Sequence, residues 1–318
     1  MPWRVGIDEA GYGPNLGPLV QTAVGIRAEH PDVLTSQSLS RLFRRCDAPK
    51  DERILIDDSK KLFSAKRDLR LLEESTLSTL TPSALPLPTL FEKWLACTAP
   101  ASVRSVQQEP WFVGTEMVPL EVDVRAIANS QEFFTCTCDR IGIVEVRCFS
   151  IITTPREFNA LLENGWNKAD ITAAGVSELF RWISAGIDSA ETVEFCVDRQ
   201  GGRRYYRELI ENAFPDVWIR PLQEEETCSC YETFSEPKFR WSFATGADAS
   251  DWTVAWASMM CKYVRERLMG QFNAYWRRHC PHLRPTAGYP LDARRFLSDI
   301  EHLISDLHIP LDWIWRRR

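Results

Sequence analysis

The chain has 318 residues, of which 44% are hydrophobic and 26% charged, proportions typical of a soluble globular protein with one large domain or two smaller ones. No apolar run approaches the roughly 18 residues of a membrane-spanning helix, which argues against an integral membrane protein. The formal net charge of −6 disfavours a passive nucleic-acid binder, because such a protein depends on positive charge. With no signal peptide apparent, we expect a cytoplasmic protein whose ten cysteines are reduced thiols.

The first part of the chain has the pattern of two strands around a turn. Residues 3–8 form an apolar run, a turn rich in glycine and proline follows, and residues 19–26 form a second apolar run. Over residues 64–80, leucines alternate with charged residues, which predicts an exposed amphipathic helix. Residues 82–140 differ in composition, with early prolines, a short helix near 90–96 and weak strand signals after it, so we interpret them as an insertion.

The second half of the chain alternates strands with helices. Residues 142–152 and 193–197 have the apolar character of strands, and Thr154-Pro155-Arg156-Glu157 is typical of a helix start. Further helices are expected over 176–183, over 203–214 and over 254–268, where apolar residues recur at spacings of three and four. This alternation indicates an α/β fold.

Two adjacent acids follow the first predicted strand, in the run Asp8-Glu9-Ala10-Gly11-Tyr12-Gly13-Pro14. Acids beside an apolar strand are costly unless they are solvated, paired or bound to a cation. Because neighbouring side chains on a strand point to opposite faces, both acids can serve one site only if the strand ends there. Gly11 and Gly13 would supply the turn and admit a ligand to the backbone. A glycine-rich hairpin with exposed acids would have the same composition.

Two more acids lie at the ends of predicted elements, where ligand-binding residues are often found. Asp198 ends the apolar strand at 193–197, and ligand sites in α/β sheets favour such strand ends. Asp248 precedes the predicted helix that begins near Thr253, where a helix cap is the other interpretation, although Ser250 and Asp251 are better placed for capping. Singly, each acid is more often structural than catalytic. Together, four carboxylates would suit Mg²⁺ or Mn²⁺, which prefer oxygen ligands.

The order of these motifs resembles that of ribonuclease HII, the type 2 ribonuclease H family. Gly6-Ile7-Asp8-Glu9-Ala10-Gly11-Tyr12-Gly13-Pro14, with Gly17-Pro18, is similar to the family signature, and Asp58-Ser59-Lys60-Lys61-Leu62 resembles its next motif. Val197-Asp198, Ala247-Asp248 and Gly288-Tyr289-Pro290 resemble the regions of the third acid, the fourth acid and a C-terminal glycine-tyrosine motif. These five motifs stand in the family's order and span nearly the whole chain.

The resemblance implies a ribonuclease H-like α/β fold, a mixed sheet flanked by helices, and an endoribonuclease that cuts RNA in RNA–DNA hybrid duplexes or at ribonucleotides embedded in DNA. It also implies that two Mg²⁺ or Mn²⁺ ions activate a water and stabilise the departing 3′ oxygen. By the same resemblance, the metal-binding and catalytic residues would be Asp8, Glu9, Asp198 and Asp248. The residues that contact the substrate would be Gly11, Tyr12, Gly13, Ser59, Lys60, Lys262 and Tyr289.

The chain departs from the family pattern at Tyr12, where the family usually has an arginine between the two glycines, and in the insertion. Two alternatives therefore stay open: a metal-dependent nuclease of this fold with another nucleic-acid substrate, and a non-catalytic RNA- or hybrid-binding protein. Retention of all four acids disfavours the second. We expect a monomer with a catalytic domain over residues 1–270, including the insertion at 82–140, and a C-terminal helical, substrate-binding extension over 271–318.

Two other patterns have competing interpretations. Cys136-x-Cys138 and Cys228-x-Cys230 could be halves of a zinc site, although structural zinc pairs usually have at least two intervening residues, so ordinary thiols are favoured. Trp313 and Trp315, beside the terminal arginines, could stack on nucleic acid, but a core position is favoured.

Overall fold

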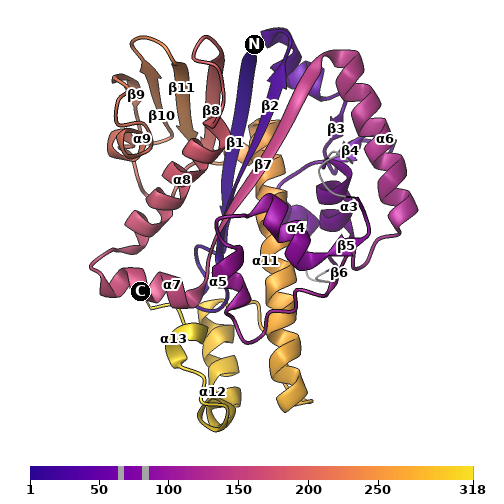
Figure 1. Cartoon of the computed structure of the whole chain (residues 1–318), viewed down its shortest axis with the longest axis vertical. Helices are drawn as coiled ribbons and strands as arrows, with labels where there is room; N and C mark the ends of the chain where they lie inside the picture. Colours follow the sequence, from indigo (N-terminus) through magenta and orange to yellow (C-terminus); the bar gives the residue numbers. More distant parts are fainter. Residues whose placement is uncertain (64–67, 81–85, 318) are drawn as a thin grey trace.

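A seven-stranded mixed sheet forms the centre of the molecule (Figure 1). The structure is a computed structural model that describes residues 1–63, 68–80 and 86–317. In sheet order the strands are β7 (Ile143–Thr153), β2 (Leu19–Ala28), β1 (Pro2–Ala10), β8 (Thr192–Asp198), β11 (Lys238–Ala244), β10 (Cys228–Thr233) and β9 (Ile219–Glu224). β1, β8 and β11 run parallel to one another, and the other neighbours pair antiparallel. The predicted fold, a mixed sheet flanked by helices, is confirmed.

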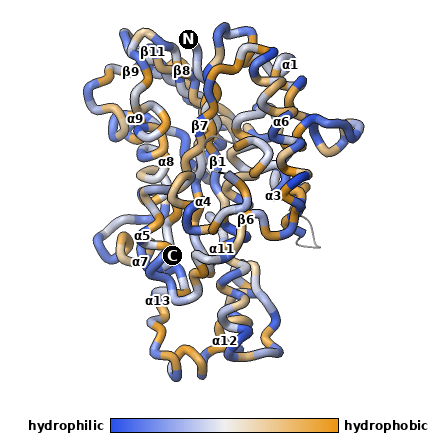
Figure 2. Tube along the Cα trace, turned by 45° about the vertical axis from the view of Figure 1, so that its right-hand side comes forward, coloured by the Kyte–Doolittle hydropathy of each residue, from blue (hydrophilic) through white to orange (hydrophobic). Residues whose placement is uncertain are grey.

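Different helices cover the two faces of this sheet. α11 (Trp252–His279) packs on β1 and β2, and Gly6 permits this close approach because a Cβ there would lie 2.1 Å from the carbonyl carbon of Thr253. α8 (Lys168–Ser184) and α9 (Arg207–Ala213) lie on the opposite face, where Val5 and Ile7 join the hydrophobic core. Hydrophobic segments run through the central sheet, as along β7, whereas hydrophilic segments dominate outer parts such as those around α6 (Figure 2).

Helix caps predicted from the sequence are present. α7 (Pro155–Glu163) begins after Thr154 with a reciprocal capping box that involves Glu157. The Asp251 side chain caps α11 by accepting hydrogen bonds from the N–H groups of Thr253 and Val254, at 2.8 and 3.1 Å. α11 contains the predicted segment 254–268 but extends beyond both of its ends, through the domain boundary proposed at residue 270.

The remaining elements connect and cover the sheet. Between β2 and β7 lie η1 (Pro31–Leu34), α1 (Ser36–Leu39), β3 (Phe43–Arg44), β4 (Ile54–Leu55), α2 (Ser59–Leu62), α3 (Arg70–Ser78), β5 (Thr89–Leu90), α4 (Phe91–Thr98), α5 (Val103–Gln107), β6 (Met117–Val118) and α6 (Val124–Ile141). Later in the chain come α10 (Ala247–Ser250), α12 (Pro290–Asp306) and α13 (Leu311–Ile314).

Three sequence predictions need correction. β9, β10 and β11 were not expected, although the alternation of buried Phe239, Trp241 and Phe243 along β11 is a strand signal. α6 replaces the weak strand signals of the insertion, because its aromatic and β-branched residues pack as one helical face on the core. α3 is not exposed: Glu73 and Leu77 are buried against neighbouring helices, while residues 64–67 of the predicted helix lie outside the described residues.

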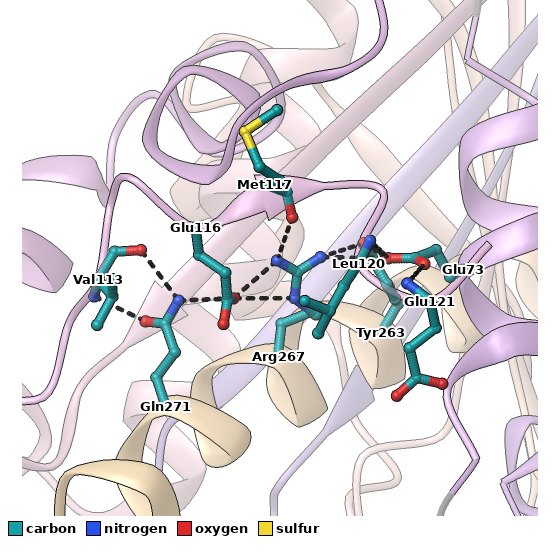
Figure 3. A network of polar contacts seen from close by, with 9 residues as sticks. All are labelled: Glu73, Val113, Glu116, Met117, Leu120, Glu121, Tyr263, Arg267 and Gln271. Carbon is teal, nitrogen blue, oxygen red and sulfur yellow. Dashed lines mark hydrogen bonds and ion pairs between the residues drawn. The ribbon is translucent and has the colours of Figure 1, made fainter. Parts of the chain in front are cut away.

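A buried polar network ties the insertion to α11 (Figure 3). The Glu73 carboxylate of α3 accepts hydrogen bonds from the N–H groups of Leu120, Glu121 and Val122, at 2.6–3.0 Å. On its other side Glu73 accepts bonds from Tyr263 Oη (2.7 Å) and Arg267 Nη1 (3.2 Å) of α11. Because both Glu73 and Arg267 side chains are fully buried, the insertion is built into the core rather than appended to it.

The C-terminal segment packs beneath the sheet and returns to it. α12, α13 and the last turns of α11 share a hydrophobic cluster that includes Phe272, Phe296 and Ile314. Trp313 and Trp315 pack against this cluster, which favours the core interpretation over stacking on nucleic acid. Among the described residues, no helix is long and apolar enough to cross a membrane.

The two cysteine pairs do not form a shared zinc site. Cys136 and Cys138 lie on α6, which packs near β7 at one edge of the sheet, whereas Cys228 and Cys230 lie on β10 near the other edge. All ten cysteines are free thiols.

Candidate active site

Asp8 and Asp198 meet because of the register between two parallel strands. Ile7 of β1 pairs with Val197 of β8, so the next residues, the two aspartates, stand side by side at the carboxyl ends of strands about 4.8 Å apart. Burial, and then the neighbouring Asp198, raise the pKa of Asp8 well above its usual value, although a hydrogen bond with Ser258 opposes this. The arrangement therefore concentrates negative charge where the parallel strands end.

Glu9 reaches the same place from the other face of the sheet. It pairs with Gln21, whose side chain donates to Thr172 O of α8, so Glu9 faces α8 whereas Asp8 faces α11. The prediction that β1 ends at these acids is wrong, because β1 continues to Ala10. β8 instead ends at Asp198, which leaves the sheet open beside Glu9. Burial, and then Asp198, raise the pKa of Glu9 to about 7.

Asp248 is placed by the short helix α10. The N–H of Ala247 donates to Asp198 Oδ1 at 2.9 Å, so this contact holds the start of α10 against the end of β8. Burial raises the pKa of Asp198, and the charge of Asp248 raises it further. Burial also raises the pKa of Asp248, as does Asp58. Because Asp251 caps the following helix, Asp248 is not needed as its cap.

The motif around Ser59 lies next to Asp198, Asp248 and the serine that contacts Asp8. Lys60 lies near enough to Asp198 and Asp248 for its charge to lower the pKa of both. Ser59 is only 6% exposed, and its Oγ lies 3.1 Å from that of Ser258, which itself forms a hydrogen bond with Asp8. Within this motif, the charge of Lys60 is the one that acts on Asp198 and Asp248, whereas Lys61 pairs with Asp57.

The Lys262 side chain is also mostly buried, with 16% of it exposed. Its Nζ forms an ion pair with Glu266 at 2.7 Å, one helical turn further along α11, and lies 4.7 Å from the centre of the Phe63 ring. Its charge is therefore largely balanced within the protein.

The glycine-rich turn borders the acids and meets the C-terminal motif. Gly11 has φ +93°, and a Cβ there would lie 2.4 Å from Pro18 O, so only glycine fits without strain. A Cβ on Gly13 would meet Tyr289 Cε1 at 3.7 Å, which places the half-exposed Tyr289 ring beside the turn. Lys168 Nζ lies 3.7 Å from the centre of the Tyr12 ring.

Three residues that the sequence does not assign to the site lie beside the acids and the turn: Lys168, Gln200 and Arg316, the last of which the sequence predicts to belong to an exposed basic cluster but which is buried. Lys168 and Gln200 both lower the pKa of Glu9, and Arg316 donates hydrogen bonds to the glycine-rich turn. Lys168 has a weak signal, since it opens a helix after the Asn167 cap. No local pattern distinguishes Gln200 or Arg316.

The chemistry of the donor set fits divalent cations. Carboxylate oxygens are the ligands that Mg²⁺ and Mn²⁺ prefer, and bound cations would offset the burial and the mutual repulsion that raise the pKa of Asp8, Glu9 and Asp198. Within residues 1–63, 68–80 and 86–317, no three His, Cys, Asp or Glu side chains already have the geometry of a metal site.

A sizeable cavity lies away from these acids. It measures about 790 Å³ and is lined by residues that include Trp3, Arg4, Glu194 and Phe239. These residues stand at the amino ends of β1, β8 and β11, opposite the acids. Since ligand sites of α/β sheets favour the carboxyl ends of parallel strands, the acids and not this cavity mark the candidate active site.

Among known proteins, this chain is similar to several solved structures. No protein-family model and no curated protein matches it. It is similar to ribonuclease HII of Archaeoglobus fulgidus, solved as a complex with PCNA, with 18% identity, a TM-score of 0.47 and coverage of 99% of this chain and 94% of that one. For ribonuclease H2 of Pyrococcus horikoshii OT3, the corresponding values are 15%, 0.42, 98% and 92%.

A third similar structure is Bst-RNase HIII in complex with Mn²⁺, with 14% identity, a TM-score of 0.43 and coverage of 99% of this chain and 66% of that one. These structural neighbours are type 2 and type 3 ribonucleases H. The family that the sequence motifs resemble, ribonuclease HII, is among them. At identities of 14–18% and TM-scores below 0.5, the activity of this chain has to be inferred from its own residues.

Proposed function

We propose that this protein is a metal-dependent endoribonuclease that hydrolyses RNA in RNA–DNA hybrid duplexes or at ribonucleotides embedded in DNA. The observation that carries the proposal is the register of β1 and β8, which brings Asp8 and Asp198 side by side next to the glycine-rich turn. Glu9 and Asp248 adjoin them from the opposite face and from α10.

The proposed roles follow from these positions. Asp8 and Asp198 would be central ligands of two Mg²⁺ or Mn²⁺ ions, with Glu9 and Asp248 on either side. Bound there, the ions would supply an activated water and charge stabilisation for the departing 3′ oxygen. Lys60, beside Asp198 and Asp248, is placed to attract the phosphate.

Substrate selection is proposed for the turn and its neighbours. Gly11 and Gly13 leave the backbone of the turn bare, so that its peptide groups can approach a ribose hydroxyl, the group that distinguishes RNA from DNA. Tyr289 offers a half-exposed ring beside Gly13 for packing on a sugar. In this chain the Tyr12 ring stacks against the Lys168 ammonium, which keeps a positive charge at the turn although the family's arginine is absent.

The domain proposal assigns residues 1–270 to the catalytic domain, including the insertion at 82–140, and 271–318 to substrate binding through Tyr289. We propose a monomer. The main alternative is a nuclease of the same fold with another substrate, which the replacement of the family's arginine by Tyr12 favours. A non-catalytic binder is disfavoured, because four carboxylates would repel a phosphate backbone without any compensating chemistry.

Cleavage of labelled duplexes that contain four ribonucleotides, one or none tests the proposal directly. Each duplex is incubated with Mg²⁺, Mn²⁺ or a chelator, using the natural protein, Asp8→Asn, and Asp216→Asn as a control at an exposed position away from the site. We expect metal-dependent cutting at the ribonucleotides that Asp8→Asn loses and Asp216→Asn keeps. Hybrid binding without cutting under either metal would support the non-catalytic alternative instead.

A further inference from the structure

The end of the chain forms a short strand-like contact with the glycine-rich turn. Trp315 forms a β-bridge with Leu16, and Arg316 N donates to Asn15 O at 2.7 Å. Asn15 Nδ2 in turn donates to Arg316 O at 3.2 Å. Figure 1 shows the C-terminus beside α7, and Asn159 of that helix holds the tail by donating to Asp312 O (2.9 Å) and Trp315 O (2.7 Å).

The Arg316 side chain continues from this contact into the interior of the turn. It is only 2% exposed, and its Nη2 donates to Gly11 O and to Pro14 O, both at 2.5 Å. The guanidinium also lies 5.3 Å from the centre of the Phe158 ring. The buried side chain of Arg316 therefore bridges the two ends of the segment Gly11–Pro14.

This burial is unfavourable for a cation. Burial, and then the nearby Arg265, lower the pKa of Arg316 to about 9. Both acceptors of its Nη2 are neutral carbonyls, which compensate a buried charge less well than a carboxylate does. An apolar side chain of similar volume would often serve stability equally well or better. The arginine is therefore better explained by what its donors do to the turn than by stability.

Its donors set the direction of the peptide groups in the turn. A trans peptide is planar, with the C=O of one residue and the N–H of the next pointing opposite ways. When Arg316 draws Gly11 O inward, the Tyr12 N–H is turned outward. The same relation is visible at Pro14, whose carbonyl faces Arg316 while the next N–H, of Asn15, donates to Gly288 O at 2.8 Å. Gly288 immediately precedes Tyr289, so this clamp also places the Tyr289 ring.

We propose that Arg316 is a positioning residue of the active site, which orients the glycine-rich turn and Tyr289 toward the RNA strand of the substrate. The proposal rests on the function proposed above and adds a dependence on the segment that contains Trp315 and Arg316. Arg317 provides a matched control, because its side chain is exposed and forms ion pairs with Asp312 and Glu163 at the surface.

The test compares Arg316→Met, Arg316→Lys and Arg317→Met with the natural protein. We would measure kcat and KM on a hybrid duplex, and the ratio of affinities for hybrid and all-DNA duplexes in Ca²⁺. We expect Arg316→Met to lower kcat by about 100-fold, which is the loss of rate expected when a reacting group is misplaced by about 1 Å. We also expect it to bring the ratio of affinities for hybrid and all-DNA duplexes close to one. Arg316→Lys should recover part of both, and Arg317→Met should match the natural protein.

Arg316→Ala adds a test by chemical rescue, because guanidinium chloride at millimolar concentration should restore activity where equal sodium chloride does not. A loss of folded protein would reduce activity but leave the affinity ratio of the remaining folded molecules unchanged. Arg316 variants that keep the natural kcat and affinity ratio, or that lose activity only in proportion to folded protein, would overturn the proposal. If the natural protein itself does not cut the hybrid, the proposed function fails, whatever the variants do.

Discussion

Replacement of Arg267 by methionine should lower the free energy of unfolding by about 3–5 kcal/mol, the range for removing one partner of a buried ion pair. The Arg267 guanidinium contacts Glu73 Oε1 at 3.2 Å, Glu116 Oε2 at 2.7 Å and Met117 O at 2.9 Å. After the change, Glu73 keeps its backbone donors and Tyr263 but loses the positive charge that balances its own. Since proteins have about 5–15 kcal/mol of stability in total, this is a large fraction.

A double-mutant cycle separates lost charge from lost packing. Glu73→Gln in the Arg267→Met background removes the uncompensated negative charge, so the double variant should be destabilised by less than the sum of the two single variants. Urea unfolding followed by tryptophan fluorescence reports the free energies, since the chain has 12 tryptophans.

Arg70→Met is the control for this cycle, because Arg70 pairs with Asp68 at the surface with 67% of its side chain exposed. Its effect should stay within about 0.5 kcal/mol. A change below about 1 kcal/mol for Arg267→Met, or strict additivity in the cycle, would refute the view that this network holds the insertion to α11.

Three further predictions concern the site and a buried acid. Mn²⁺ should raise the melting temperature of the natural protein, because binding to the native state stabilises it, and Asp8→Asn should abolish the shift in a thermal-melt assay. Gly11→Ala should destabilise the protein by about 1–3 kcal/mol, since φ is +93° and Cβ would lie 2.4 Å from Pro18 O; Gly13→Ala, with its nearest contact at 3.7 Å, should not change the urea midpoint. Burial raises the pKa of Glu109 to about 8, so its neutral form stabilises the native state at low pH, and this contribution is lost between about pH 4.5 and 8. Glu109→Gln should therefore flatten the decline of stability over that range; an unchanged slope in urea titrations would contradict the assignment.

The sequence alone determined the features that depend on neighbouring residues. An apolar run that ends on Asp198 predicts a buried strand with a carboxylate at its end, and the spacing of Val254 to Leu268 predicts the buried face of α11. Asp251 could be named as a better cap than Asp248, because capping requires only residues within one turn. These are local requirements of backbone hydrogen bonding and amphipathic burial, so they can be seen in a short stretch of chain.

Only the tertiary structure decided which distant groups meet. Pairing in register between β1 and β8 places Asp8 beside Asp198, whereas the sequence predicts only that each follows a strand. Ser59 is buried with its Oγ 3.1 Å from that of Ser258, and this contact depends on how α2 packs against α11. Arg316 binds Gly11 although 305 positions separate them. A surface arginine and a buried one have the same local sequence pattern, because burial is decided by long-range packing and not by neighbouring residues.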